Sequence, residues 1–252
     1  MPLLYNLLLP MLLFSACGQI STGDNHNTIR ASEPIPGSKA PFSVVELFTS
    51  ESCSSCPAAE KLLAEYVDKP NVFVLEFHVD YWNHLNWKDK FSSPEYTNRQ
   101  RWYAGIFNLN SVYTPQAVVN GKYELVGSDR QTLARYIQSN NGNTTVSLPD
   151  IKVNADEREL LVSSQEKINN ALLNIALVQR HAETLVKRGE NAGVTIRHHN
   201  IVRGFETAAL DGNTSLKINM PEGLSKDECL LMAYVQNKNN GEIVSIILLD
   251  MP

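Results

Sequence analysis

Two cysteines separated by two residues, Cys53 and Cys56, stand at the junction of two apolar patterns. The run Val44–Phe48 predicts a buried strand, and the apolar residues from Cys56 to Val67 recur at helical spacing. A dithiol at such a junction lies at a helix N-terminus, where unpaired N–H groups and the helix dipole favour a thiolate. The spacing also lets Cys56 attack a mixed disulfide formed at Cys53. The pattern therefore predicts a redox-capable pair in which Cys53 is the more exposed and more acidic thiol.

The segments around the dithiol predict an alternating α/β arrangement. A second buried strand is expected at 72–77, and the strand–helix–strand order implies a parallel pair with a right-handed crossover. Pro94 is typical of a first helical turn, Asn120–Gly121 of a hairpin, and the Ser128–Gln131 capping box of a helix start. The order β-α-β-α-β-β-α predicts a thioredoxin-like domain over residues 42–140.

Pro115 is the second mark of the candidate site, because it directly precedes the third predicted strand. In thioredoxin-like folds a cis-proline at this place packs against the dithiol, and the residue before it offers main-chain groups to an extended substrate. We therefore expect a cis Thr114–Pro115 bond and a substrate-binding role for both residues. A proline that merely starts a strand is the alternative.

A polar break at 140–144 precedes a segment of different character. Six or seven short alternating or apolar runs between 146 and 249 are divided by turns rich in Gly, Asn and Asp. This spacing predicts an antiparallel β-sandwich-like domain over residues 145–252.

The first 17 residues form an apolar run that ends in Ser15–Ala16–Cys17. The run is shorter than the 20 or so apolar residues that span a bilayer, and it is typical of a lipoprotein signal peptide cut before Cys17. The sequence thus predicts an exported protein, anchored to a membrane by lipid on Cys17, with a flexible polar tether at 18–41. A plain secretory signal or a misassigned start is the alternative.

The charge and the cysteine content exclude several classes of protein. The net charge is −5 and no basic stripe is present, so no nucleic-acid partner is expected. Four cysteines are too few for the disulfide framework of a small secreted domain. Cys229 begins an apolar run and is expected to be a buried free thiol. No cofactor is predicted, and the oligomeric state stays open.

Polar residues after the second strand are candidates for proton transfer. His78 and Asp80 lie where loops approach the dithiol in this arrangement, so either side chain could exchange a proton during disulfide exchange. Hydrogen bonding within a turn is the alternative. His198 and His199 are adjacent on a predicted strand and should point to opposite faces, so no metal site is predicted there.

Four motifs give the chain a family resemblance: Leu47–Ser50 with Cys53–Pro57, His78–Trp82, Tyr113–Gln116 and Arg188–Gly193. Together they resemble a bacterial family of secreted thioredoxin-like proteins of unknown function (DUF1223-like). The resemblance implies the fold and the two-part architecture, and it brings no established reaction. The Arg188–Gly193 segment is interpreted as a shaped loop between strands.

Three functions fit these observations. The first is a thiol–disulfide oxidoreductase acting outside the cytoplasm on a protein or a small thiol or disulfide, with Cys53 attacking and Cys56 resolving. The second is a metal-binding protein or metallochaperone in which the two thiols hold Cu(I), with His78 as a third ligand. The third is a non-enzymatic, surface-anchored binding module with a vestigial dithiol.

Overall fold

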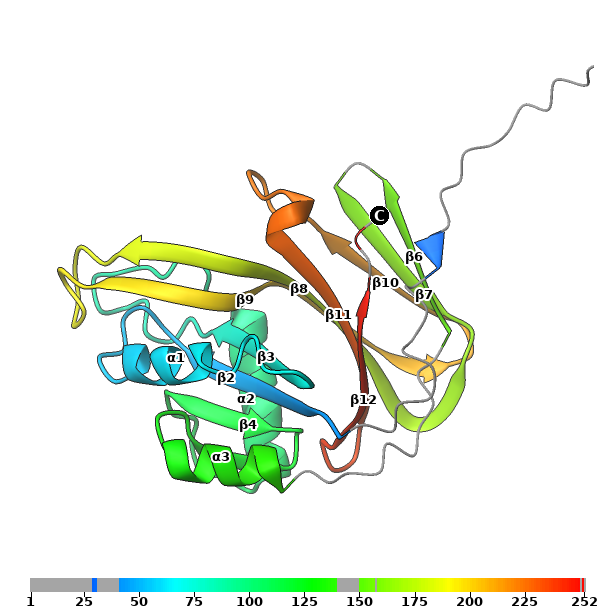
Figure 1. Cartoon of the computed structure of the whole chain (residues 1–252), viewed down its shortest axis with the longest axis horizontal. Helices are drawn as coiled ribbons and strands as arrows, with labels where there is room; N and C mark the ends of the chain where they lie inside the picture. Colours follow the sequence, from blue (N-terminus) through cyan, green and yellow to red (C-terminus); the bar gives the residue numbers. More distant parts are fainter. Residues whose placement is uncertain (1–28, 31–40, 140–149, 157, 250, 252) are drawn as a thin grey trace, which may run out of the picture.

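The computed structural model describes residues 29–30, 41–139, 150–156, 158–249 and 251. They form a mixed α/β fold with one eight-stranded sheet and one smaller, four-stranded antiparallel sheet (Figure 1). The expected signal peptide and Cys17 lie outside these residues. Of the expected tether, only residues 29, 30 and 41 are described, and Ile29–Arg30 forms a short strand, β1, paired with residues 152–153. Among the described residues no helix is long and apolar enough to cross a membrane.

The first half of the chain builds one end of the large sheet, and each strand and helix expected there is present. The strands run in the order β3-β2-β4-β5, with β3 parallel to β2 and the other pairs antiparallel. The elements are β2 (Ser43–Thr49), α1 (Cys56–Ala64), β3 (Val72–His78), α2 (Pro94–Ile106), β4 (Gln116–Val119), β5 (Tyr123–Val126) and α3 (Arg130–Gln138).

The alternation of side chains along β2 assigns the helices to opposite faces of this sheet. Val44 and Phe48 pack with α2, whereas Val45 and Leu47 pack with α1 and α3. Both faces are therefore apolar, and β2 is buried along its whole length.

The second half adds seven further strands and one short 3-10 helix. The elements are β6 (Ile151–Asp156), β7 (Glu159–Ser164), β8 (Lys167–Leu185), β9 (Thr195–Asp211), β10 (Thr214–Asn219), η1 (Lys226–Glu228), β11 (Cys229–Asn237) and β12 (Ile243–Leu249).

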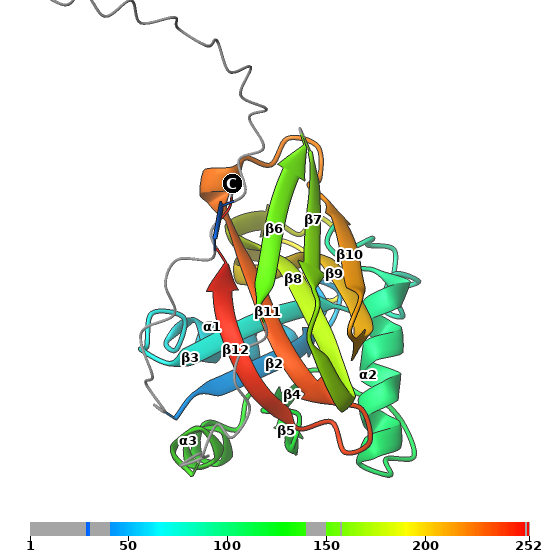
Figure 2. The same ribbon diagram turned by 90° about the vertical axis from the view of Figure 1, so that its right-hand side faces the viewer.

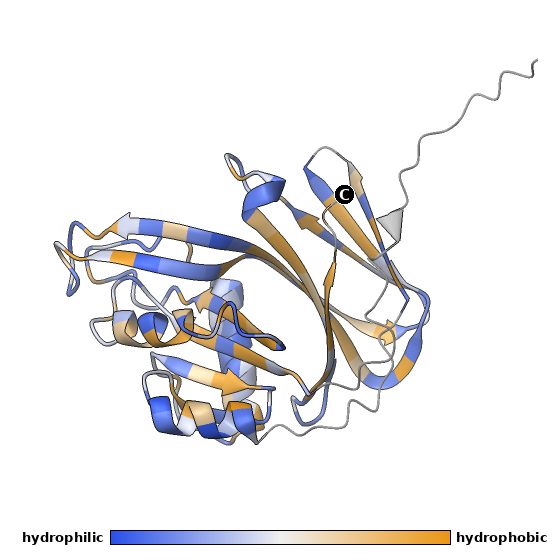
Figure 3. Cartoon of the chain, viewed as in Figure 1, coloured by the Kyte–Doolittle hydropathy of each residue, from blue (hydrophilic) through white to orange (hydrophobic). Residues whose placement is uncertain are grey.

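Four of these strands extend the sheet of the first half, in contrast to the separate sandwich expected from the sequence. The large sheet continues as β12-β11-β8-β9-β3, and β9 meets β3 in parallel where Glu76 pairs with Ile201. The strands β8 and β9 have 19 and 17 residues, because each continues through polar residues at the end far from the apolar core. Figure 3 shows these hydrophilic ends, which the apolar runs alone did not reveal.

A sandwich-like core nevertheless forms where the small sheet packs on the far end of the large one (Figure 2). Apolar side chains of β6, β7 and β10 meet those of β8, β11 and β12 there. The strand β8 therefore contributes to this core and also pairs with β9, which in turn pairs with β3 of the first half.

Candidate functional site

Cys53 and Cys56 are joined by a disulfide in the loop between β2 and α1. The helix begins at Cys56, with Ser55 as its N-cap and Pro57 in its first turn. Cys53 therefore lies in the loop before the helix, whereas the sequence predicted it at the helix N-terminus. Both cysteines are buried, with exposures of 2% for Cys53 and 0% for Cys56. The two serines between them are exposed, so the turn itself faces solvent.

The peptide bond between Thr114 and Pro115 is cis, and Pro115 is buried immediately before β4. The main-chain carbonyl of Pro115 accepts a hydrogen bond from Gly127 N at 2.9 Å. A Cβ added at Gly127 would lie 3.3 Å from the Cβ atoms of both Pro115 and Ala59, so the proline lies beside α1, the helix that Cys56 begins. Trp82 Nε1 donates to Thr114 Oγ1 at 2.8 Å and joins two of the sequence motifs.

The Arg188–Gly193 segment lies directly on the dithiol loop. Asn191 is buried, and its side-chain amide donates to the main-chain carbonyls of Glu51 and Cys53, each at 2.9 Å. Glu190 Oε2 accepts a hydrogen bond from Ser54 N at 3.1 Å. A loop from the second half of the chain thus positions the main chain on both sides of the first cysteine.

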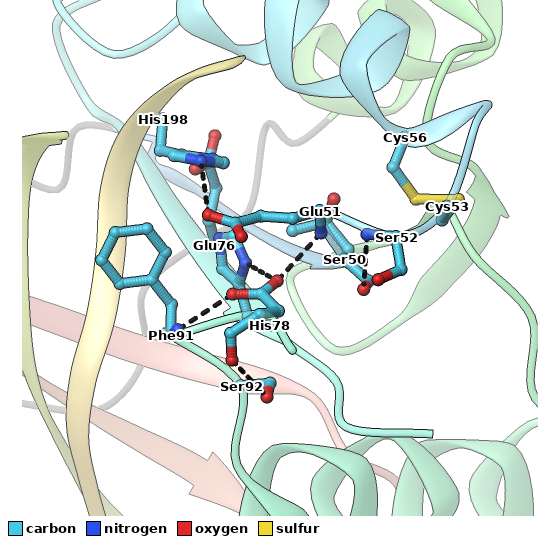
Figure 4. Close-up of polar contacts among 12 residues, drawn as sticks. Ser50, Glu51, Ser52, Cys53, Cys56, Glu76, His78, Phe91, Ser92 and His198 are labelled. Carbon is cyan, nitrogen blue, oxygen red and sulfur yellow. Dashed lines mark hydrogen bonds and ion pairs between the residues drawn. A yellow bond between two sulfur atoms is a disulfide. The ribbon is translucent and has the colours of Figure 1, made fainter. Parts of the chain in front are cut away.

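A cluster of buried ionisable side chains lies next to this loop, and in Figure 4 it lies on the other side of the Ser50–Ser52 segment from the disulfide. His78, at the end of β3, bonds through Nδ1 to Asp89 Oδ2 at 2.7 Å. Asp89 also accepts from the main-chain N–H groups of Glu51 and Phe91, at 2.9 Å each. These three contacts fix the plane and the tautomer of the His78 ring, with Nε2 left to face the cluster.

His198, from β9, lies between two glutamates of the first half. Its Nδ1 is 2.8 Å from Glu60 Oε2, and its Nε2 is 3.3 Å from Glu51 Oε1. Glu60 also accepts from Thr49 Oγ1 at 2.6 Å, and Glu51 accepts from Trp87 Nε1 at 2.7 Å. Burial opposes protonation of His198, but the contacts with the two carboxylates outweigh it and raise its pKa to about 10.

Glu76, on β3, completes the cluster and is fully buried. Its Oε2 accepts from His199 N at 3.0 Å, whereas Oε1 has no hydrogen-bond partner. Burial, reinforced by the negative charge of Glu60, holds the pKa of Glu76 well above its ordinary value. Three further buried atoms of the cluster have no hydrogen-bond partner: Glu51 Oε1, His78 Nε2 and His198 Nε2.

The structure separates the two residues expected to transfer protons. Asp80 accepts from Thr97 Oγ1 at 2.6 Å, and its own N–H donates to the same hydroxyl at 3.1 Å, which ties the turn after β3 to α2. His78 points into the buried cluster. Its partner is therefore Asp89, which the sequence analysis did not select.

Sequence reasoning also missed Glu51, Glu60 and His198. A signal for His198 was present, because β9 buries every second residue from Ile196 to Val202 and His198 occupies that register. The expectation that the two adjacent histidines face opposite ways is confirmed by their burial, since His198 is buried and His199 is partly exposed. Ligand atoms of Glu60, His78 and His198 all lie within 4.8 Å of one another, so these three side chains could hold a metal ion.

A second buried polar cluster lies on the opposite face of β2, under α2. Arg99 donates to Glu46 Oε1 at 2.6 Å, and the same nitrogen reaches the hydroxyls of Tyr103 and Tyr234 at 3.3 and 3.0 Å. Cys229 is a buried free thiol, as expected. Two cavities of 270 and 410 Å³ lie between α2 and β9, and neither is lined by the cysteines.

The fold and the site define a mixed α/β protein with a disulfide at a strand–helix junction and a buried acidic–histidine cluster beside it. Residues 44–236 match the family described as "Protein of unknown function (DUF1223)", and the chain belongs to this family. No curated protein matches the sequence.

Solved structures similar to the chain include those of two other proteins. Protein AGR_C_4864 from Agrobacterium tumefaciens is 28% identical, with a TM-score of 0.64, and the alignment covers 83% of this chain and 95% of that one. HBP35 of Porphyromonas gingivalis is 15% identical, with a TM-score of 0.52 and coverage of 84% and 75%. The second likeness concerns the fold alone.

Proposed function

We propose that the protein is a thiol–disulfide oxidoreductase built on a thioredoxin-like scaffold. The observation that carries the proposal is the Cys53–Cys56 disulfide at the start of α1, on the helix beside cis-Pro115. A disulfide that joins a loop cysteine to the first residue of a helix, with the two serines between them facing solvent, suits reversible exchange better than structural cross-linking. Closing so short a loop removes little chain entropy.

The reaction proceeds in two exchanges. In the reduced protein, the Cys53 thiolate attacks one sulfur of a substrate disulfide; an S–S bond forms at Cys53, and the other substrate sulfur leaves as a thiolate. The Cys56 thiolate then attacks Cys53 Sγ, closes the Cys53–Cys56 bond and releases the second substrate thiolate. Two electrons pass from the dithiol to the substrate, and the reverse sequence oxidises a substrate dithiol.

The residues around the disulfide have distinct parts in this proposal. Thr114 offers its main-chain groups to an extended protein substrate or a small disulfide, and Pro115, whose own carbonyl is bonded to Gly127 N, helps to position that substrate. Of the two candidates for proton transfer, His78 is favoured over Asp80, because Asp80 is engaged with Thr97 in a turn. Since Cys53 is buried, substrate approach requires the exposed Ser54–Ser55 turn and its contact with Glu190 to move.

Trapping the intermediate tests the proposal. In a Cys56→Ser variant, Cys53 should form a mixed disulfide that nothing resolves, so a partner or glutathione should accumulate on the protein under non-reducing conditions. The Cys53→Ser variant should trap none. The proposal fails if neither variant traps a partner and the wild type neither reduces model disulfides nor oxidises model dithiols. If instead the wild type binds Cu(I) stoichiometrically and both variants lose this binding, the dithiol is assigned to metal binding.

We further propose that the protein is exported and anchored to a membrane by lipid on Cys17. A Cys17→Ser variant should appear in the soluble fraction, whereas wild type should partition with membranes. Equal partitioning of the two proteins would contradict the lipid anchor and leave the chemistry of the dithiol unaffected.

A further inference from the structure

We propose that Glu60, His78 and His198 bind one divalent transition-metal ion of the zinc class. The three residues come from α1, β3 and β9, and their ligand atoms lie within 4.8 Å of one another. Zinc binds nitrogen and oxygen ligands at about 2.0–2.2 Å, which places the ligands of a tetrahedral ion about 3.3–3.5 Å apart. Side-chain shifts of about 1 Å would bring these three atoms to that spacing.

The orientation of His78 is the first independent support. Its Nδ1 is held by Asp89 Oδ2 at 2.7 Å, and its Nε2 is buried without a partner. Metal-binding histidines commonly have this arrangement, in which a carboxylate takes one ring nitrogen and the other is aimed at the ion. Asp89 is itself held by two main-chain N–H groups, so the ring has little freedom to turn away.

The charge of the cluster is the second support. It contains four carboxyl groups, of Glu51, Glu60, Glu76 and Asp89, each at most 1% exposed. Burial favours the neutral form of Glu76, so the other three can carry negative charge. Their hydrogen bonds and ion pairs in the described chain go to histidine, tryptophan, threonine and main-chain groups, and none goes to Lys or Arg. Several carboxylates without a full counter-charge are costly to bury. A divalent cation would supply two of the missing positive charges at once.

A proton on His198 is the competing occupant, since an imidazolium between Glu51 and Glu60 would also add positive charge. That arrangement pairs His198 with Glu60 at 2.8 Å and with Glu51 at 3.3 Å, but it leaves His78 Nε2 without a hydrogen-bond partner. A metal ion accounts for the free nitrogen of His78, which a proton on His198 does not. The geometry therefore favours the ion.

Two imidazoles and one carboxylate form a set of two nitrogen ligands and one oxygen ligand, which suits Zn²⁺ and also fits the facial arrangement that binds Fe(II). All three side chains are buried, so the ion would connect α1 and β3 of the first half to β9 of the second. It would lie beneath the dithiol loop without cysteine ligands, and its binding does not depend on thiol exchange between Cys53 and Cys56. An ion on His78 would, however, exclude that ring from proton transfer, because Asp89 already holds its Nδ1.

Zinc retention by the full chain tests the site. Because the ligands are buried, the oxidised protein is unfolded in urea with a chelator, refolded with Zn²⁺ or without metal, dialysed, and analysed for bound metal and for its thermal midpoint. We expect one zinc per chain and a higher midpoint in the zinc-refolded sample. His78→Gln and His198→Gln should lose the stoichiometric zinc. A Cys53→Ser/Cys56→Ser double variant should keep it.

Two further measurements make the test decisive. Co²⁺ in the same protocol should give the visible bands of a tetrahedral site and no thiolate charge-transfer band. Asp89→Asn, a milder change that leaves one acceptor oxygen for His78 Nδ1 and the two main-chain N–H groups, should lower zinc affinity about 10–100-fold even if the ligand variants fail to fold. The matched control is His181→Gln, because His181 and His199 form a partly exposed pair 3.2 Å apart that could also bind metal. The proposal is overturned if the wild type retains no zinc, if Asp89→Asn binds as tightly as wild type, or if His181→Gln removes the bound ion.

Discussion

The side-chain amide of Asn191 bridges the main-chain carbonyls of Glu51 and Cys53, with both hydrogen bonds at 2.9 Å. An Asn191→Ala variant leaves both carbonyls without this donor inside the protein, which typically destabilises by about 1–3 kcal/mol. We expect a lower urea midpoint and faster reduction of the disulfide by dithiothreitol, because the loop around Cys53 is no longer held. Asn239→Ala, at an exposed turn, is the control and should change neither. Unaltered reduction kinetics in Asn191→Ala would show that the loop is held by other contacts.

Two ion pairs of equal length should differ greatly in their effect on stability. Arg99 and Glu46 are 2.6 Å apart with side-chain exposures of 7% and 0%, whereas Arg130 and Glu65 are 2.6 Å apart with exposures of 59% and 51%. Removing one partner of a buried pair costs about 3–5 kcal/mol, because the other charge remains buried. Removing one partner of an exposed pair has little effect on stability, because water and salt screen the two charges. Denaturant unfolding of Arg99→Met and Arg130→Met should reproduce this order, and similar losses for both would contradict it.

Two glycines offer a matched pair of alanine substitutions. Gly121 has φ +63°, and a Cβ there would lie 1.7 Å from Gly241 O in the turn between β11 and β12. Gly121→Ala should therefore destabilise by about 2–4 kcal/mol, through backbone strain and the forced movement of that turn. Gly105, in α2, has nothing within 4 Å of an added Cβ, so Gly105→Ala should stabilise by up to about 1 kcal/mol. Thermal unfolding of both variants checks the opposite signs.

The thiol of Cys229 should titrate late in the folded protein. Burial, with the nearby charge of Glu228, raises its pKa to about 11. A thiol two pH units below its pKa is only about 1% ionised, so alkylation should be slow at pH 9 and should accelerate towards pH 11. In urea the same thiol should react with a midpoint near its ordinary pKa of about 8.5. Mass spectrometry of iodoacetamide-treated, oxidised Cys17→Ser protein measures both curves, and a folded midpoint near 8.5 would refute the expectation.

Local patterns in the first half were strong enough to predict its elements. A strand run before Cys53, a proline at the first turn of α2 and an Asn-Gly hairpin each act within a few residues. The pairing of β9 with β3 is different, because it joins residues far apart in sequence. Polar residues cover the outer parts of β8 and β9, so the apolar runs ended before the strands did.

The candidate site was predictable only in part, because several of its residues meet through contacts that are distant in sequence. The cysteines and Pro115 carry recognisable local spacing, and Cys56 does begin the helix region. Glu51, Glu60 and His198 have no such spacing, since they meet only after β9 is placed against β3 and α1. The one available signal was the position of His198 among the alternately buried residues of β9, which predicts that the side chain is buried but does not predict which residues it contacts.

The position of β9 also constrains how a nascent chain can assemble. The bond between His199 and Glu76 spans 123 residues, and that between Asn191 and Cys53 spans 138. Contacts so distant in sequence form slowly, because a large loop must close before they stabilise anything. Translation produces both cysteines long before residues 188–193, which contact the dithiol loop in the folded protein. The S–S bond can therefore form before that segment folds against it. Oxidation would then precede the burial of the acidic–histidine cluster by β9. A ribosome-bound chain stalled before residue 191 should expose a pair of cysteines that the finished molecule keeps covered.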